Sequence, residues 1–138
     1  MIKLENNWRQ KSLESLENNT WPVLSSDEGS YLIKTGNSLR KKQLQDFTTE
    51  DLRIMIGQEI GLCFLIPLAI ETLTDNLFAE GDMYEGDLLK NVLDVDTKFW
   101  DDNKNYWQQL DDLIKGKRHE IKEMKFDISK FDNCKHSQ

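Results

Sequence analysis

Apolar positions are most concentrated in the middle of the chain, between residues 47 and 89. From Leu52 to Ile60 they recur at spacings of three and four, with polar residues between them, which predicts an amphipathic helix. Residues 62–73 are apolar at nearly every position, and this run predicts a second helix that is buried on most of its sides. We expect these two helices to build the core of the protein.

Residues that start and stop helices bound this pair. The hydroxyl of Thr48 or Thr49 can accept from the free N–H groups of a first helical turn, and Gly61 is expected to be a stop or a tight hinge. Pro67 removes a hydrogen bond from a helix interior, so we expect it in a first turn or at a kink. The apolar run ends at Glu71, short of the roughly 20 apolar residues that a membrane span needs. The segment is therefore interpreted as a core helix and not as a membrane anchor.

The same helical spacing recurs on both sides of the central pair. It predicts four further helical segments, over residues 7–17, 31–42, 87–100 and 103–125. The third allows a break at residues 94–96, and Gly116 interrupts the fourth. Residues 126–131 alternate apolar and polar side chains, a pattern that permits a short strand. Strand signals are poor elsewhere, so the predicted fold class is all-α, a mostly helical single domain with at most one short C-terminal strand.

The length of 138 residues is suited to one domain with one core. We predict a single helical domain over residues 1–131, followed by a disordered tail over residues 132–138. The segment Met1–Asn6 lacks the apolar region of a signal peptide, so a cytoplasmic location is expected. Cys63 and Cys134 are expected to be free thiols, with Cys63 buried in the apolar run and Cys134 in the polar tail.

Charge changes the picture because it is unevenly distributed. The formal net charge is −7, and residues 71–112 carry twelve acidic residues against three lysines. Residues 113–138 are net basic. A surface like the central one repels phosphate backbones and attracts basic partners, so direct binding to nucleic acid is disfavoured.

Two acid–glycine–acid triplets lie five residues apart in the acidic span, Glu80-Gly81-Asp82 and Glu85-Gly86-Asp87. Three interpretations stay open for them. They form a turn whose acids stay in water, an acidic surface that faces a partner, or a site for a divalent ion or a general acid–base pair. A second acidic segment, Asp94, Asp96, Asp101 and Asp102, lacks the glycine and the closing glutamate of a calcium loop, which favours helix caps and solvated charges.

Trp100 lies next to Asp101 and Asp102, and of the four tryptophans we expect it to be the exposed one. An exposed tryptophan beside carboxylates is typical of an interface anchor. The two histidines, His119 and His136, have no neighbours at metal-ligand spacing, and the glycines form neither a phosphate-binding loop nor a dinucleotide fingerprint. No metal, cofactor or catalytic residue is predicted.

Several ordered strings resemble the contact-dependent growth inhibition immunity proteins of Gram-negative bacteria, over roughly residues 20–100. The strings are Ser30-Tyr-Leu-Ile-Lys-Thr, Leu39-Arg-Lys-Lys-x-Leu-x-Asp-Phe-Thr-x-Glu-Asp-Leu-Arg-Ile-x-Ile-Gly-Gln, Gly61-Leu-x-x-Leu-Ile-Pro-Leu-Ala and Asn76-x-Phe-Ala-Glu-Gly-Asp-x-Tyr-x-Gly-Asp-Leu-Leu. The segment after Asp102 is less distinctive.

The resemblance implies a small, non-enzymatic cytoplasmic antidote. Such a protein binds the C-terminal toxin domain of its cognate inhibitor as a 1:1 heterodimer and covers the active site, and many of these toxins are nucleases, ribonucleases among them. The acidic surface agrees with this, because a nuclease presents a basic cleft to phosphate. The charge and the short apolar run described above already predict that the protein binds neither nucleic acid directly nor a membrane.

Family motifs locate the scaffold better than the contact surface, since such pairs are often specific to their own partner. We assign Leu52, Ile56, Leu65 and Leu68 to the core. The hypothetical toxin-binding residues are Glu80, Asp82, Glu85, Asp87, Asp94, Asp96, Trp100, Asp101 and Asp102. The alternatives are a small enzyme that uses the carboxylates of residues 80–87, with or without a metal, and an adaptor for another basic protein.

Overall fold

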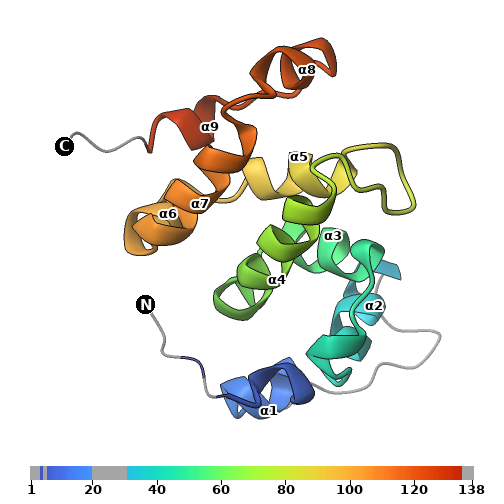
Figure 1. Ribbon diagram of the computed structural model, residues 1–138. Helices are drawn as coiled ribbons and strands as arrows, with labels where there is room; N and C mark the ends of the chain where they lie inside the picture. The colour runs from blue at the N-terminus through green and yellow to red at the C-terminus, as the bar shows by residue number, and fades with distance from the viewer. Residues whose placement is uncertain (1–3, 5, 20–30, 135–138) are drawn as a thin grey trace.

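The computed structural model describes residues 4, 6–19 and 31–134 (Figure 1). Within these residues the chain is mostly helical and contains no sheet, only an isolated antiparallel bridge between Ser12 and Gln43. The predicted all-α class is therefore confirmed. Trp21 lies outside the described residues.

Two short 3-10 helices and nine α-helices make up the described chain. They are η1 (Trp8–Gln10), α1 (Leu13–Glu17), α2 (Tyr31–Leu39), η2 (Leu44–Asp46), α3 (Thr49–Gly57), α4 (Leu62–Asp75), α5 (Asp87–Leu93), α6 (Thr97–Asp102), α7 (Lys104–Ile114), α8 (Arg118–Glu123) and α9 (Ser129–Asp132). No helix among the described residues has the length and apolar content that a bilayer crossing requires.

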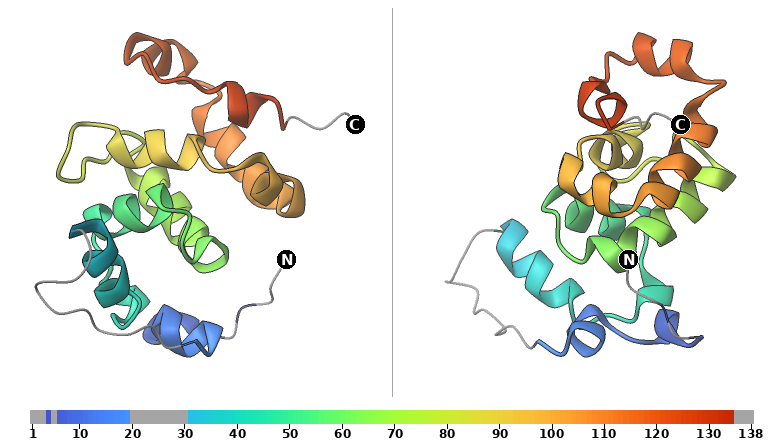
Figure 2. Two further views of the ribbon diagram at one scale, coloured as in Figure 1. Left: turned by 180° about the vertical axis from the view of Figure 1, so that it is seen from behind. Right: turned by 90° about the vertical axis from the view of Figure 1, so that its left-hand side faces the viewer.

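Helix α4 occupies the centre of the molecule and packs against α3, α5 and α7 (Figure 1). α1 and α8 lie at opposite ends in all views (Figure 2). Of the four residues assigned to the core, Leu52, Ile56 and Leu65 are buried, and Leu68 is half-buried against the same cluster. The apolar run of the sequence thus forms the centre of the core, as predicted.

The start of α3 follows from local chemistry. Thr48 Oγ1 accepts from the Asp51 backbone N–H at 3.1 Å, and the Asp51 carboxylate accepts in return from the Thr48 N–H at 3.0 Å. This reciprocal capping box satisfies two N–H groups that the helix leaves free. Of the two threonines predicted as candidate caps, Thr48 is the cap and Thr49 is the first residue of α3.

Gly61 separates α3 from α4 and precedes the first residue of α4 with a φ of 66°. A Cβ atom at this position would lie 2.7 Å from Leu13 Cδ1, so the glycine allows α1 to approach the start of α4. Pro67 lies inside α4, beyond its first turn.

The predicted helix over residues 7–17 is interrupted. It divides into η1 and α1 at Lys11 and Ser12. Ser12 adopts an extended conformation, pairs with Gln43 and accepts from the Ser15 N–H at 3.2 Å through its hydroxyl. Serine prefers a helix cap to a helix interior, and this preference sets the break.

Two expectations for the C-terminus are wrong. Residues 126–131 do not form a strand, because α9 begins at Ser129 and the described chain offers no neighbouring strand to pair with. The expected disordered tail does not begin at Asp132, which ends α9, and Cys134 is buried. The cause is packing: Phe131 and Cys134, one helical turn apart, both face the core. Residues 135–138 lie outside the described residues.

Candidate functional site

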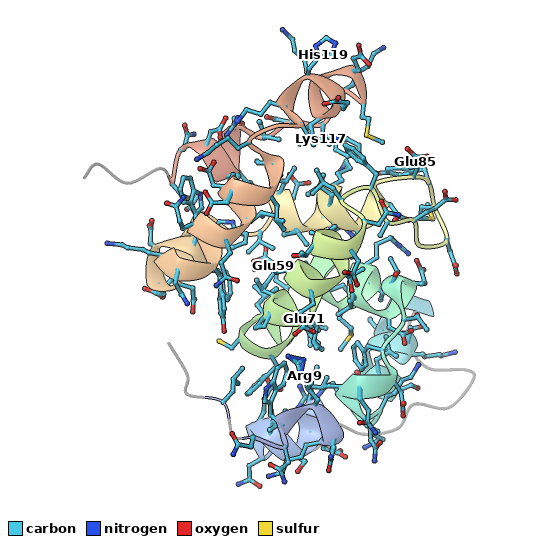
Figure 3. All side chains as sticks on the ribbon, viewed as in Figure 1. Arg9, Glu59, Glu71, Glu85, Lys117 and His119 are labelled. Atoms are coloured by element: carbon cyan, nitrogen blue, oxygen red, sulfur yellow. The ribbon has the colours of Figure 1, made fainter. Side chains whose placement is uncertain are left out.

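The loop that joins α4 to α5, residues 76–86, carries the first group of predicted acids and is called here the acidic loop. Glu80, Asp82 and Glu85 are exposed on it. Figure 3 shows Glu85 on this loop, which projects from the body of the molecule. These three carboxylates are available to a partner.

Asp87, the fourth acid of the two triplets, is buried, with 2% of its surface exposed. Its carboxylate accepts from the backbone N–H groups of Gly81 at 2.7 Å, Met83 at 3.0 Å and Tyr84 at 3.3 Å. The expectation that Asp87 contacts a partner is therefore wrong. Its carboxylate holds the acidic loop in one conformation instead.

A second carboxylate, from α3, fixes the same loop. Glu50 accepts from Arg53 through two hydrogen bonds of 2.6 Å, and its Oε1 also accepts from the Asp82 N–H at 2.8 Å. Arg53 Nε lies 3.7 Å from Asp87 Oδ2, so one guanidinium serves both acids. A Cβ atom at Gly81 would lie 2.6 Å from Glu50 Oε1, so a larger residue there would require the Glu50 carboxylate to shift.

The electrostatics follow from these contacts. The hydrogen bonds from Arg53 are the main cause that lowers the pKa of Glu50, with burial opposing and the Asp82 N–H adding to the decrease. The hydrogen bond to Glu50 raises the pKa of Arg53. Both groups are thus held in their charged forms, and we call Glu50, Arg53 and Asp87 the loop clamp.

Replacing Glu50 by glutamine is expected to weaken the fold at neutral pH and to flatten its loss of stability in acid. A carboxyl group whose pKa is lowered in the folded protein contributes in full above its ordinary pKa, and that contribution disappears as the pH falls through the lower, folded-state value. Urea unfolding at pH 7 and at several values below about pH 4.5 measures this. Glu85→Gln, on the exposed part of the loop, should follow the wild type. If the unfolding free energy of Glu50→Gln fell with decreasing pH as steeply as that of the wild type, the lowered pKa of Glu50 would be contradicted.

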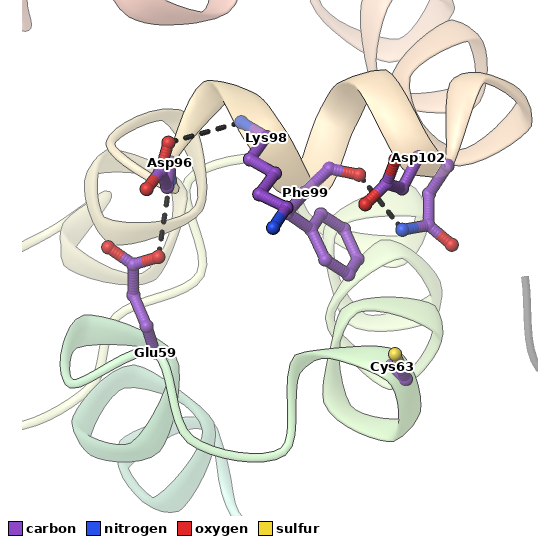
Figure 4. Close-up of a pocket in the computed structure, with 7 residues that line it drawn as sticks. Glu59, Cys63, Asp96, Lys98, Phe99 and Asp102 are labelled. Carbon is purple, nitrogen blue, oxygen red and sulfur yellow. Dashed lines mark hydrogen bonds between the residues drawn. The ribbon is translucent and has the colours of Figure 1, made fainter.

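The second group of predicted acids, Asp94, Asp96, Asp101 and Asp102, is exposed around α6. Asp96 caps α6, since its carboxylate accepts from the Lys98 N–H at 3.1 Å, as the sequence indicated. Glu59 accepts from the Asp96 N–H at 3.3 Å. Two of the four acids, Asp96 and Asp102, border a hollow of about 650 Å³ (Figure 4), lined by Glu59, Cys63, Asp96, Lys98, Phe99, Asp102 and Asn103.

The two acidic groups do not form one site. The hollow includes Cys63, in the first turn of α4, whereas the acidic loop follows the last residue of that helix. A helix of 14 residues is about 21 Å long, so the hollow and the acidic loop lie at opposite ends of α4.

Trp100 is fully buried, with 0% exposed, so the expectation of an exposed anchor is wrong. Its ring meets Phe131 edge to face at 5.4 Å between centroids, and Phe99 in the same manner at 5.2 Å. Trp8 and Trp107 are also buried. Phe131 comes from the far end of the chain, which is why the acidic neighbours of Trp100 were misleading.

Sequence reasoning missed both the clamp and the tip of the loop. Glu50 and Arg53 were not identified as a pair, although their spacing of three is typical of helix residues that interact. Met83 and Tyr84 are exposed between the acids of the loop. The sequence signal for this exposed tip was the presence of two large apolar residues inside an acidic, glycine-rich segment.

Two observations concern the alternative of a metal or acid–base site. Within the described residues no group of three or more His, Cys, Asp or Glu side chains could hold a metal ion. The carboxylate of Asp87 is occupied by three N–H groups and is not free to act as a base.

Comparison with known proteins identifies the family. The family model described as CDI immunity proteins, where CDI is contact-dependent growth inhibition, matches residues 15–110. The match covers more than two thirds of the chain, from α1 into α7, and includes the acidic loop, its clamp and the hollow. Neither the curated proteins nor the solved structures provide a match. The chain therefore belongs to the CDI immunity proteins, a non-enzymatic family, and neutralises a CDI toxin.

Proposed function

We propose that this immunity protein places its acidic loop over the basic active-site cleft of its cognate toxin, and that the toxin is a nuclease such as a ribonuclease. The observation that carries the proposal is the rigid display of Glu80, Asp82 and Glu85 on a projecting loop. The loop is fixed at its backbone by the clamp carboxylates of Glu50 and Asp87. An acidic element that projects is complementary to a basic cleft in both shape and charge.

Two physical effects favour this mode of inhibition. Negative charges on the loop accelerate encounter with a basic surface and compete there with the phosphates of a nucleic acid substrate. A loop that is already ordered loses little conformational freedom on binding, so more of the contact energy remains as affinity. The clamp supplies that order before the toxin arrives.

The acidic loop suits a cleft better than the hollow beside α6 does. The hollow is concave and of mixed charge, because Lys98 lines it together with Glu59, Asp96 and Asp102. A concave surface cannot enter a cleft. We therefore assign the toxin contact to the loop and treat residues 94–102 as the competing surface.

The proposed complex is a 1:1 heterodimer that forms in the cytoplasm. A single projecting loop supplies one docking element per chain. A nuclease toxin acts where nucleic acid is present, and its inhibitor has to meet it in the same compartment.

Neutralising the loop charges is expected to slow association with the toxin. In the variant Glu80→Gln/Asp82→Asn/Glu85→Gln the association rate constant should fall about tenfold at low salt, and the difference should shrink as salt screens the charges. Stopped-flow mixing with the purified cognate toxin domain over a series of salt concentrations measures it.

A matched control removes the same number of charges from the competing surface, residues 94–102. Asp94→Asn/Asp101→Asn/Asp102→Asn spares Asp96, which caps α6, and should bind at nearly the wild-type rate. If the control variant associated with the toxin more slowly than the loop variant, the interface would be assigned to residues 94–102 instead. A wild-type protein that forms no complex with the toxin, or a toxin that leaves nucleic acid intact, would refute the corresponding part of the proposal.

A further inference from the structure

We propose that Met83 and Tyr84, at the tip of the acidic loop, are the apolar anchor of the complex and insert into an apolar recess in the basic cleft of the toxin. The inference rests on the proposed function, because it takes the toxin as the partner. It goes further because it assigns the slow dissociation of the complex to two uncharged side chains. The carboxylates of the loop form a rim around them.

The exposure of these two residues is the first argument. Met83 is 64% exposed and Tyr84 is 42% exposed. Among the described residues the other large apolar side chain with comparable exposure is Ile33, at 50%, and it stands on α2. Two adjacent exposed apolar residues on a projecting loop are typical of a site that a partner covers.

The conformation of the tip is the second argument. Both backbone N–H groups of the tip donate to Asp87, Met83 at 3.0 Å and Tyr84 at 3.3 Å. The ring of Tyr84 lies against Phe126, with 6.3 Å between the ring centroids. At the base of the loop, the Gly86 N–H donates to the Phe78 carbonyl at 3.1 Å. The tip is thus oriented before binding, which lowers the entropic cost of inserting it.

The composition of the tip specifies the partner. An apolar centre with a polar rim is the usual arrangement of a protein interface, and tyrosine is enriched among residues that dominate binding energy. Methionine adapts its shape to an irregular recess. The rim of Glu80, Asp82 and Glu85 selects a basic surround and disfavours pairing of the loop with a second copy of itself, since like charges would meet.

The test compares the anchor with an apolar residue of similar exposure elsewhere. Met83→Ala/Tyr84→Ala should raise the Kd for the purified cognate toxin domain about 100-fold, chiefly through faster dissociation. Ile33→Ala should stay within about twofold of the wild type, because α2 lies outside the proposed contact. Surface plasmon resonance gives both rate constants, and thermal unfolding of the free variants checks that the fold is intact.

Further variants keep the outcome unambiguous. Tyr84→Phe and Met83→Leu retain the apolar volume and should bind nearly as tightly as the wild type. If the wild type binds and the double variant stays within about threefold of Ile33→Ala, the anchor is refuted while the inhibitor function stands. If the wild type does not bind the toxin, both proposals fail. Hydrogen exchange of the complex should show protection concentrated in residues 80–86, and protection around residues 94–102 alone would also refute the anchor.

Discussion

Replacing Phe131 by alanine is expected to lower the free energy of unfolding by about 4 kcal/mol. The ring is fully buried, stacks on Trp107 with 5.0 Å between centroids, and lies perpendicular to the Trp100 ring with 5.4 Å between centroids. Truncation removes the contact surface of two tryptophans and leaves a cavity between α6, α7 and α9. Urea unfolding monitored by tryptophan fluorescence measures the loss directly, because both indoles lie beside the substituted ring.

Two milder substitutions separate volume from hydrogen bonding. Phe131→Leu keeps most of the apolar volume and should cost less than half as much as the alanine variant. Trp107→Phe removes the indole N–H that donates to the Phe131 carbonyl at 2.8 Å, and should cost about 1 kcal/mol beyond the change in packing. A loss below about 1 kcal/mol for Phe131→Ala would mean that α9 does not belong to the core.

The same aromatic cluster shows where sequence reasoning stops. Trp100 was expected at the surface because two aspartates follow it, yet a helix turns successive side chains in different directions. Asp101 and Asp102 point to solvent while Trp100 points inward. Trp100 and Trp107 lie on different helices, α6 and α7, so their spacing of seven does not place them on one helical face. The partner that buries Trp100 is 31 positions away, at Phe131, and local patterns do not reveal it.

Residues 126–131 illustrate an ambiguity of short apolar patterns. The spacing of two between Phe126 and Ile128 fits a strand. The spacing of three from Ile128 to Phe131 and on to Cys134 fits a helix. The helix forms because Phe131 and Cys134 both reach the core. A helix cap, by contrast, depends on residues within one helical turn. The cap predicted at Thr48 or Thr49 is found at Thr48.

The acidic loop shows the same limit at the candidate site. Glu85 and Asp87 belong to one triplet, but one is exposed and the other is buried. What distinguishes them is Arg53, which α3 brings to within 3.7 Å of the Asp87 carboxylate. The sequence could therefore identify the acidic loop, but not which of its acids faces outward.

Replacing Asp87 by alanine is expected to release the acidic loop and to lower the free energy of unfolding by about 3 kcal/mol. Three backbone N–H groups, of Gly81, Met83 and Tyr84, lose their acceptor, and the partly buried Arg53 loses one of its two acids. Amide exchange at residues 81–84 should accelerate while α4 stays protected. Because the anchor would no longer be oriented, the Kd for the toxin should rise at least as far as in Met83→Ala/Tyr84→Ala.

The controls for this prediction separate position from charge. Asp82→Asn removes an equal charge from the exposed part of the same loop, leaves the Asp82 N–H to Glu50 in place, and should change stability by less than about 0.5 kcal/mol. Asp87→Asn keeps one acceptor oxygen. Its unfolding free energy and its amide exchange rates should therefore lie between those of the wild type and those of Asp87→Ala. If Asp87→Ala left the exchange of residues 81–84 unchanged, the loop would be held by something other than the clamp. If it loosened the loop without weakening toxin binding, the order of the loop would have no part in recognition.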